Sequence, residues 1–166
     1  MARKLGLGGV AVRDGTLLED LPGVMQADGL DWTLTFRRLA DDLRDPAAAA
    51  PSAGSAPSDA LADWTCRWRA ELVGQGVVVD AGSAGDPAGA LADGIAAAMD
   101  LVNPLYIPRN HVLDAALRSA EHGDLDPLRE LTDVLADPFT QRRGLEVFAA
   151  PASPEFTARF RTFCGT

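Results

Sequence analysis

Residues 31–44 read Asp-Trp-Thr-Leu-Thr-Phe-Arg-Arg-Leu-Ala-Asp-Asp-Leu-Arg, and this stretch indicates the class of fold most clearly. Its large apolar residues recur at a spacing close to that of a helical turn, which puts them on one face of a helix. They are Trp32, Phe36, Leu39 and Leu43. The charged residues, Arg37 among them, point elsewhere. The pattern predicts an amphipathic helix over 31–44 with its apolar face turned to a core.

Helix-start signals and the same apolar period predict one further helix before this one and one after it. Thr16-Leu17-Leu18-Glu19 fits a capping box, and Pro22 makes that helix short or kinked. Ser58 or Asp59 begins the other helix, which ends at Gly74 or Gly76. Its predicted apolar side is Leu61, Trp64, Trp68 and Leu72.

The second half of the chain shows the same signals. Asp86-Pro87 is typical of a helix start, and the inward side of that helix is predicted as Leu91, Ile95, Ala98 and Val102. Another helix is expected at about 109–122, ended by Gly123, and a third from Asp126-Pro127. Because their connection is short, these two helices should be antiparallel neighbours. A last short helix is expected at Ser153-Pro154, after an extended stretch over 139–153.

The predicted fold class is therefore all-α: an irregular bundle of about six helices. The run Val77-Val78-Val79 is the one strand-like stretch and is too short to make a sheet. Residues 46–58 are rich in Ala, Pro and Ser and are expected to form a disordered linker. The expected organisation is an N-terminal helical segment, 1–45, and a C-terminal one, 59–166, which together form one structural unit.

Composition excludes several classes of protein. The 166 residues contain 15 Lys and Arg against 24 Asp and Glu, for a net charge of −9, which argues against nucleic acid as a partner. No run of about 18 apolar residues exists that would span a membrane. The N-terminus has no apolar stretch typical of a secretory signal, so a cytoplasmic location is expected.

The usual chemical motifs receive structural interpretations. Gly6, Gly8 and Gly9 lack the strand, helix and Gly-Lys-Ser/Thr context of a phosphate loop and predict a plain connection. His111 and His122 are eleven residues apart, whereas two metal ligands on a helix sit three or four apart. No acid–base pair, catalytic triad or metal site emerges, so we name no catalytic, cofactor-binding or metal-binding residue.

The two cysteines receive different predictions. Cys66 lies between Trp64 and Trp68 in an amphipathic helix, where a thiol is usually a small buried hydrophobe. Cys164 lies three residues from the end, beyond the last packed element, where a thiol can reach another group. Cys164 is thus a candidate for a redox or disulfide role.

The segment Asn103-Pro104-Leu105-Tyr106-Ile107-Pro108-Arg109-Asn110-His111 resembles the Asn-Pro-x-(Tyr/Phe)-(Val/Ile)-x-Arg-Asn motif of the selenoprotein O family, also called YdiU. Further stretches are similar to family segments in order and spacing. They are Lys4–Leu7, Asp31–Leu39, Trp64–Leu72, Ala120–Asp124, Leu131–Phe139 and Phe148–Pro151. Members of this family are kinase-like protein adenylyltransferases.

The resemblance implies that the chain is the C-terminal helical part of such an enzyme. The full-length family transfers AMP from ATP to Ser, Thr or Tyr hydroxyls of protein substrates, with Mg, through a kinase-like core that lies upstream. No residue here matches that core, so whether the chain alone is an enzyme stays open, and inactivity is expected. The implied partner is the kinase-like core, as upstream sequence or as a separate chain.

For Cys164, the resemblance implies the place of a family cysteine or selenocysteine that forms a disulfide with the catalytic region. Here Gly165-Thr166 follow it, where the family commonly has two serines. Two alternatives to the enzyme fragment stay open. One is a standalone or split-gene module that docks on a kinase-like partner, and the other is a small redox protein acting through its C-terminal thiol. Whether Met1 is the true start also stays open.

Overall fold

The computed structural model describes residues 1–8, 11–46, 57–77 and 87–161. Within them the chain forms eight α-helices, one 3₁₀ helix and no strand, which confirms the all-α class. In chain order these are η1 (Ala2–Leu5), α1 (Leu17–Ala27), α2 (Trp32–Arg44), α3 (Asp59–Gly74), α4 (Pro87–Asp100), α5 (Asn110–Glu121), α6 (Asp126–Ala136), α7 (Glu146–Ala149) and α8 (Pro154–Arg159). The chain divides into two compact units, Met1–Pro104 and Leu105–Thr166.

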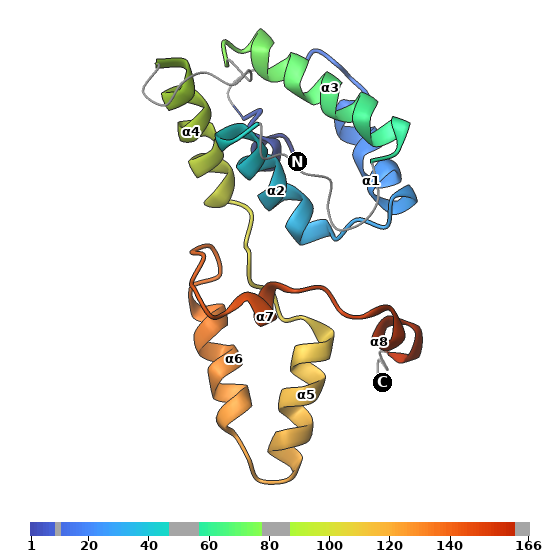
Figure 1. Cartoon of the computed structure of the whole chain (residues 1–166), viewed down its shortest axis with the longest axis vertical. Helices are drawn as coiled ribbons and strands as arrows, with labels where there is room; N and C mark the ends of the chain where they lie inside the picture. Colours follow the sequence, from blue (N-terminus) through green and yellow to red (C-terminus); the bar gives the residue numbers. More distant parts are fainter. Residues whose placement is uncertain (9–10, 47–56, 78–86, 162–166) are drawn as a thin grey trace. The chain divides into compact units, whose positions relative to one another are not determined.

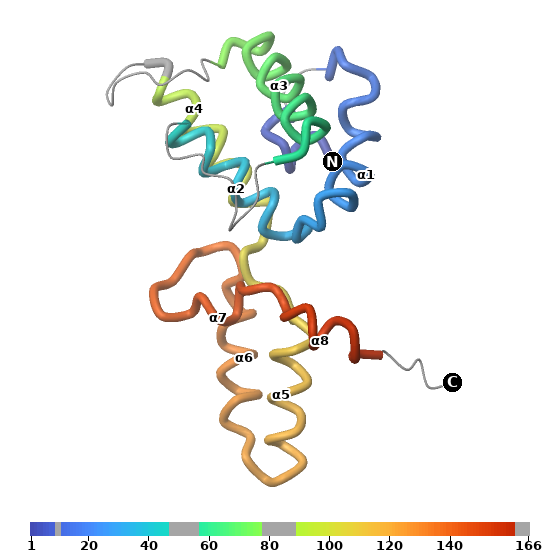
Figure 2. Tube along the Cα trace, turned by 45° about the vertical axis from the view of Figure 1, so that its right-hand side comes forward, coloured from blue at the N-terminus to red at the C-terminus, as the bar shows by residue number. Residues whose placement is uncertain are grey.

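In the first unit, α2 packs along α4, α1 packs along α3, and η1 contacts α2 and α4 (Figures 1 and 2). The sequence explains the two best-defined helix starts. Asp31 and Ser58 have extended backbones, and their side-chain oxygens accept hydrogen bonds from the Leu34 and Leu61 amides. The predictions for 31–44 and for the helix beginning at Ser58 are confirmed.

Two tryptophans of α3 lie at the centre of this unit. Trp64 and Trp68 are fully buried and stacked, with ring centroids 6.3 Å apart. The indole N–H of Trp64 donates to the Leu17 carbonyl oxygen at 2.8 Å, and that of Trp68 donates to the Leu5 carbonyl oxygen at 2.9 Å. A buried indole needs such an acceptor. The two rings therefore connect α3 to the start of α1 and to the end of η1.

Close packing at the N-terminus depends on one glycine. Gly6 ends η1 with φ +72°, and a Cβ atom added there would lie 2.6 Å from Cγ2 of Ile95 on α4. Only a residue without a side chain fits both the backbone angle and the space. The glycines at 6 and 8 form a turn, as predicted, while Gly9 lies outside the described residues.

In the second unit, α5 and α6 form the predicted antiparallel pair (Figure 1). Gly123 follows α5 with φ +89°, the left-handed conformation expected of it. Ser153 caps α8 by accepting a hydrogen bond from the Phe156 amide, which confirms the last predicted helix. The expectation of an extended stretch over 139–153 is wrong at α7, where Phe148 and Ala149 turn into the core.

The capping box at Thr16 is also wrong. Thr16 precedes α1 in a helical conformation, and its hydroxyl donates to Asp14 Oδ1 at 3.0 Å instead of accepting from an α1 amide. Asp14 outcompetes the helix end because its carboxylate already accepts from the Thr16 amide. Pro22 lies inside α1, which continues to Ala27.

Several side chains lie on a different face from the predicted one. The buried side of α4 is Ala92, Ala96 and Met99, while Leu91 is 45% exposed. The face is rotated because close contact with η1 and α2 favours small residues. Trp32, in the first turn of α2, is 45% exposed as well, and its ring makes a T-shaped contact with Phe36. Arg37, expected to point away, is buried.

The domain prediction differs from the observed division. Its boundary segment, 46–58, falls inside the first unit, and residues 47–56 lie outside the described residues, as do Val78 and Val79. The expected disorder of the linker therefore stays a prediction. Of the helices described, none combines the length and apolar character needed to cross a membrane. A cytoplasmic location stays a prediction.

Candidate functional site

Asn103 is the most buried polar residue of the Asn103–His111 motif, with 1% of its surface exposed. Its Nδ2 donates to the Lys4 carbonyl oxygen at 2.9 Å, and Lys4 Nζ donates to its Oδ1 at 3.2 Å. Lys4 Nζ also donates to the Val102 carbonyl oxygen and lies 5.1 Å from the ring centre of Phe36. The only lysine of the sequence is thus engaged within the first unit.

The burial of Arg37 on α2 is explained by the partners of its guanidinium. Its guanidinium lies 3.0 Å from Asp100 Oδ1 and donates to the Asn103 carbonyl oxygen at 3.4 Å. Asp100 also pairs with Arg44, which lies about two turns after Arg37 on the same face of α2. A buried guanidinium is tolerated only where charge and hydrogen bonds compensate its desolvation. These contacts join the end of α4 to α2.

The remaining polar residues of the motif work inside the second unit. The Tyr106 hydroxyl accepts from the Arg142 amide at 3.0 Å and donates to the Arg142 carbonyl oxygen at 3.3 Å. Arg142 in turn donates to carbonyl oxygens at the end of α6, and its guanidinium lies over the Tyr106 ring. Arg109, also buried, donates to the Ala149 carbonyl oxygen at 2.9 Å. The motif therefore binds backbone that lies 30 to 40 residues further along the chain.

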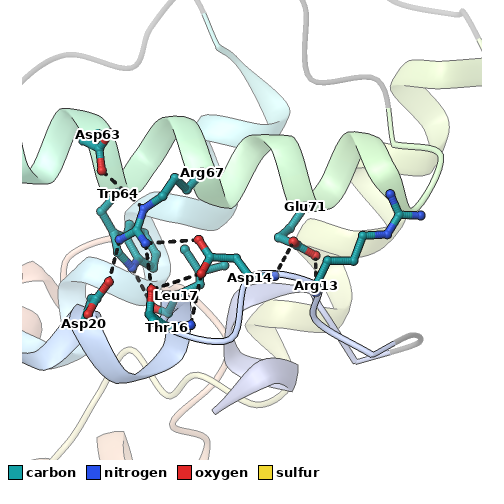
Figure 3. Close-up of polar contacts among 9 residues, drawn as sticks. All are labelled: Arg13, Asp14, Thr16, Leu17, Asp20, Asp63, Trp64, Arg67 and Glu71. Carbon is teal, nitrogen blue, oxygen red and sulfur yellow. Dashed lines mark hydrogen bonds and ion pairs between the residues drawn. The ribbon is translucent and has the colours of Figure 1, made fainter.

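Arg67 and Glu71 of α3 are the centre of a charged cluster that the sequence analysis does not predict (Figure 3). The Arg67 guanidinium pairs with Asp14, Asp20 and Asp63 at 2.8–3.3 Å. One turn further along α3, the buried Glu71 carboxylate accepts from the Arg13 amide at 3.0 Å and from the Asp14 amide at 2.8 Å (Figure 3). The only signal in the sequence is the i, i+4 spacing of Asp63, Arg67 and Glu71.

The pKa shifts in this cluster stabilise the charged forms of its side chains, as is typical of structural ion pairs. The hydrogen bond from the Thr16 amide, with help from Arg67, lowers the pKa of Asp14. The hydrogen bond with Asp20 raises the pKa of Arg67. A general acid or base needs a pKa near neutrality, whereas these shifts move both groups away from it. The cluster fixes the 13–16 loop and α1 on α3.

The two histidines have different surroundings. His111 contacts the edge of the Phe156 ring, with centroids 5.8 Å apart, and His122 Nδ1 lies 2.7 Å from the Arg118 carbonyl oxygen at the end of α5. Cys66 is exposed, so its predicted burial is wrong: although it lies between Trp64 and Trp68 in the sequence, its side chain is on the outer side of α3. Cys164 lies outside the described residues.

In the described part of the chain, no three His, Cys, Asp or Glu side chains converge so as to hold a metal ion. Asp114 and Arg118 form an i, i+4 ion pair at 3.0 Å on the surface of α5. The polar residues described above bind the chain's own backbone or each other.

No family model matches the chain. It is 45% identical over all 166 residues to a protein nucleotidyltransferase YdiU of Rhodococcus jostii, and 43% identical over its whole length to one of Cereibacter sphaeroides. A third relative, from Chromobacterium violaceum, is 39% identical over 99% of the chain. The chain spans only about 30% of the length of these relatives.

These findings define an all-α region that is homologous throughout to protein nucleotidyltransferases. Over its whole length the chain matches the C-terminal part of members of the YdiU family. The resemblance read from residues 103–111 is thereby confirmed.

Proposed function

We propose that this chain is the C-terminal helical part of a protein nucleotidyltransferase that transfers AMP from ATP to hydroxyls of protein side chains. The observation that carries the proposal is that the whole chain matches, at 37–45% identity, relatives that bear the name protein nucleotidyltransferase. The match spans under a third of each relative, and we infer that the chemistry belongs to the remaining sequence.

The contacts among the described residues favour a structural, supporting role for this region. The motif residues Asn103, Tyr106 and Arg109 bind backbone within their own units, and Lys4 is engaged by Asn103. ATP and a divalent metal would be held by the rest of a full-length enzyme, where the metal would neutralise charge on the transferring phosphoryl group. We therefore infer that the chain alone does not catalyse transfer.

The proposal is tested by nucleotidyl transfer from ATP labelled at the α-phosphate. The probe is the Rhodococcus jostii relative without its matched part, produced as a separate polypeptide, with the relative's full-length form as the positive control. We expect label on protein from the full-length form and from the mixture of the two parts, and none from the 166-residue chain alone. Labelling by the chain alone would overturn the inference of inactivity. A mixture that binds but transfers no label would argue against the supporting role.

A docking module is the second candidate, and half-exposed leucines on α5 and α6 favour it. It is compatible with the first proposal, because a C-terminal part of an enzyme must also pack on the rest of it. The redox alternative rests on Cys164, which lies outside the described residues, and stays a prediction.

A further inference from the structure

One face of the α5–α6 hairpin carries a row of leucines that stay accessible to solvent. Leu117 is 48% exposed and Leu125 is 44% exposed, and three more leucines of the row are half-buried. The row, here called the leucine face, consists of Leu113, Leu117, Leu125, Leu128 and Leu135.

Helix geometry places these leucines on the same side of the hairpin. The two helices face each other through Ala116 and Leu131, which are nearly fully buried. At about 100° per residue, Leu113 is displaced from Ala116 by about 60° and Leu117 by about 100°, while Leu128 is displaced from Leu131 by about 60° in the same rotational sense. In an antiparallel pair, the same sense on both helices leads to the same face of the pair.

The leucine face is not needed for the contact between the two helices. That contact already buries Ala116 and Leu131, and Val134 on α6 is only 2% exposed. A leucine left half-exposed forfeits part of the roughly 1.5–3 kcal/mol that full burial would supply. Several such residues on one face, in place of single scattered ones, are typical of an interaction surface.

The end of the hairpin beside this face is acidic. Glu121 and Asp124 are exposed there, next to Asp126, whose charge is compensated by Arg129. The nearby arginines are neutralised, since Arg118 pairs with Asp114 and Arg129 pairs with Asp126. A complementary surface would present an apolar groove bordered by arginine or lysine at this end.

We propose that the leucine face docks on the part of a YdiU-type polypeptide that lies outside the region matched by this chain. That part makes up more than two thirds of each relative. The face covers an apolar groove with a basic border, and the acidic end of the hairpin sets its orientation. This inference rests on the proposed function, because it takes the remaining polypeptide to be the partner.

Binding to the Rhodococcus jostii relative without its matched part, as a separate polypeptide, tests the proposal by sedimentation velocity. The intact 166-residue chain is compared with the double variant Leu117→Glu/Leu125→Glu. The matched control is Val73→Glu, at a 54% exposed position on α3. Wild type and V73E should bind alike, and the double variant at least about tenfold more weakly, which is 1.4 kcal/mol or more. Circular dichroism and thermal melting should show that both variants keep the fold, since the altered residues are exposed.

Three results would overturn the proposal. They are equal binding by all three proteins, no binding by the wild type, and a wild-type dimer that the double variant converts to a monomer, which would make a second copy the occupant. The transfer assay separates this proposal from the proposed function. Binding that depends on the leucine face without label transfer would count against the function alone. Label transfer by a mixture that contains the double variant, with unchanged binding, would count against the docking face alone.

Discussion

The side-chain amide of Asn103 makes two hydrogen bonds with Lys4, 99 residues earlier in the chain: one to its carbonyl oxygen at 2.9 Å and one from its ammonium group at 3.2 Å. Asparagine suits this place because its amide both donates and accepts. The pair fixes the end of the first unit to its N-terminal turn. The lysine and the first residue of the motif thus have a common structural role.

Replacing Asn103 should therefore cost stability. In Asn103→Ala, the partly buried Lys4 carbonyl loses its donor, and the ammonium group loses an acceptor. Since each unpaired buried group costs about 1–3 kcal/mol, we expect a loss of about 2–3 kcal/mol in the free energy of unfolding. Urea denaturation measures it. The control is Asn110→Ala in the same motif, which is exposed and should change stability by less than about 0.5 kcal/mol. Equal losses for both variants would contradict the role given to Asn103.

Two glycines near α4 should respond to alanine in opposite directions. Gly6→Ala requires a left-handed backbone and places Cβ 2.6 Å from Ile95, so a loss of about 2 kcal/mol or more is expected. Gly94 lies inside α4 with nothing within 4 Å of an added Cβ, so Gly94→Ala should gain about 0.5–1 kcal/mol. Thermal melting of both variants checks the sign. A stabilised G6A would show that η1 does not pack on α4 as described.

Glu71 should be intolerant of its amide analogue. Its carboxylate accepts from two backbone amides, whereas glutamine has one acceptor oxygen and would turn an N–H donor toward the other amide. Glu71→Gln should lower the free energy of unfolding by about 1.5–3 kcal/mol. Glu130→Gln, at an exposed position on α6, is the matched control and should have little effect. A neutral Glu71→Gln would mean that the 13–16 loop is not bound to α3.

The ionisation of Asp42 should contribute to the pH dependence of the free energy of unfolding. Burial raises the pKa of Asp42 above its ordinary value of 3.8, although Arg69 works in the opposite direction. The folded state then binds this proton more tightly than the unfolded state, so stability falls as pH rises through 3.8 toward the folded-state pKa. Asp42→Asn removes that loss. Its free energy of unfolding should exceed that of the wild type at pH 7, and the difference should shrink as pH falls below 3.8. A variant less stable than wild type at pH 7 would contradict a net cost of the Asp42 charge.

Local signals in the sequence predicted helices well and predicted their surroundings less well. Asp31 and Ser58 act within three residues of themselves, so their caps could be read from the sequence. Arg37 could not, because its burial depends on Asp100 and the Asn103 carbonyl, which the fold brings to it from more than 60 residues away. The same applies to Glu71, whose partners are amides of a remote loop.

The prediction of the buried face of α4 was wrong for a different reason. Leu91 and Ala98 fit the apolar period, but Ala92 and Ala96 do so equally well in an alanine-rich helix. Close approach of neighbouring helices selects the smaller residues, and single-sequence periodicity does not contain that information. The resemblance, in contrast, was specific, because several separate stretches agreed in order and spacing.

We propose above all that this chain is the C-terminal part of a nucleotidyltransferase and does not itself hold the nucleotide. Isothermal titration of the intact 166-residue chain with Mg·ATP tests it most directly, with the full-length Rhodococcus jostii relative as the positive control. We expect saturable heat for the relative and none for this chain. A saturable isotherm for the 166-residue chain, with a dissociation constant in the micromolar range, would contradict the claim.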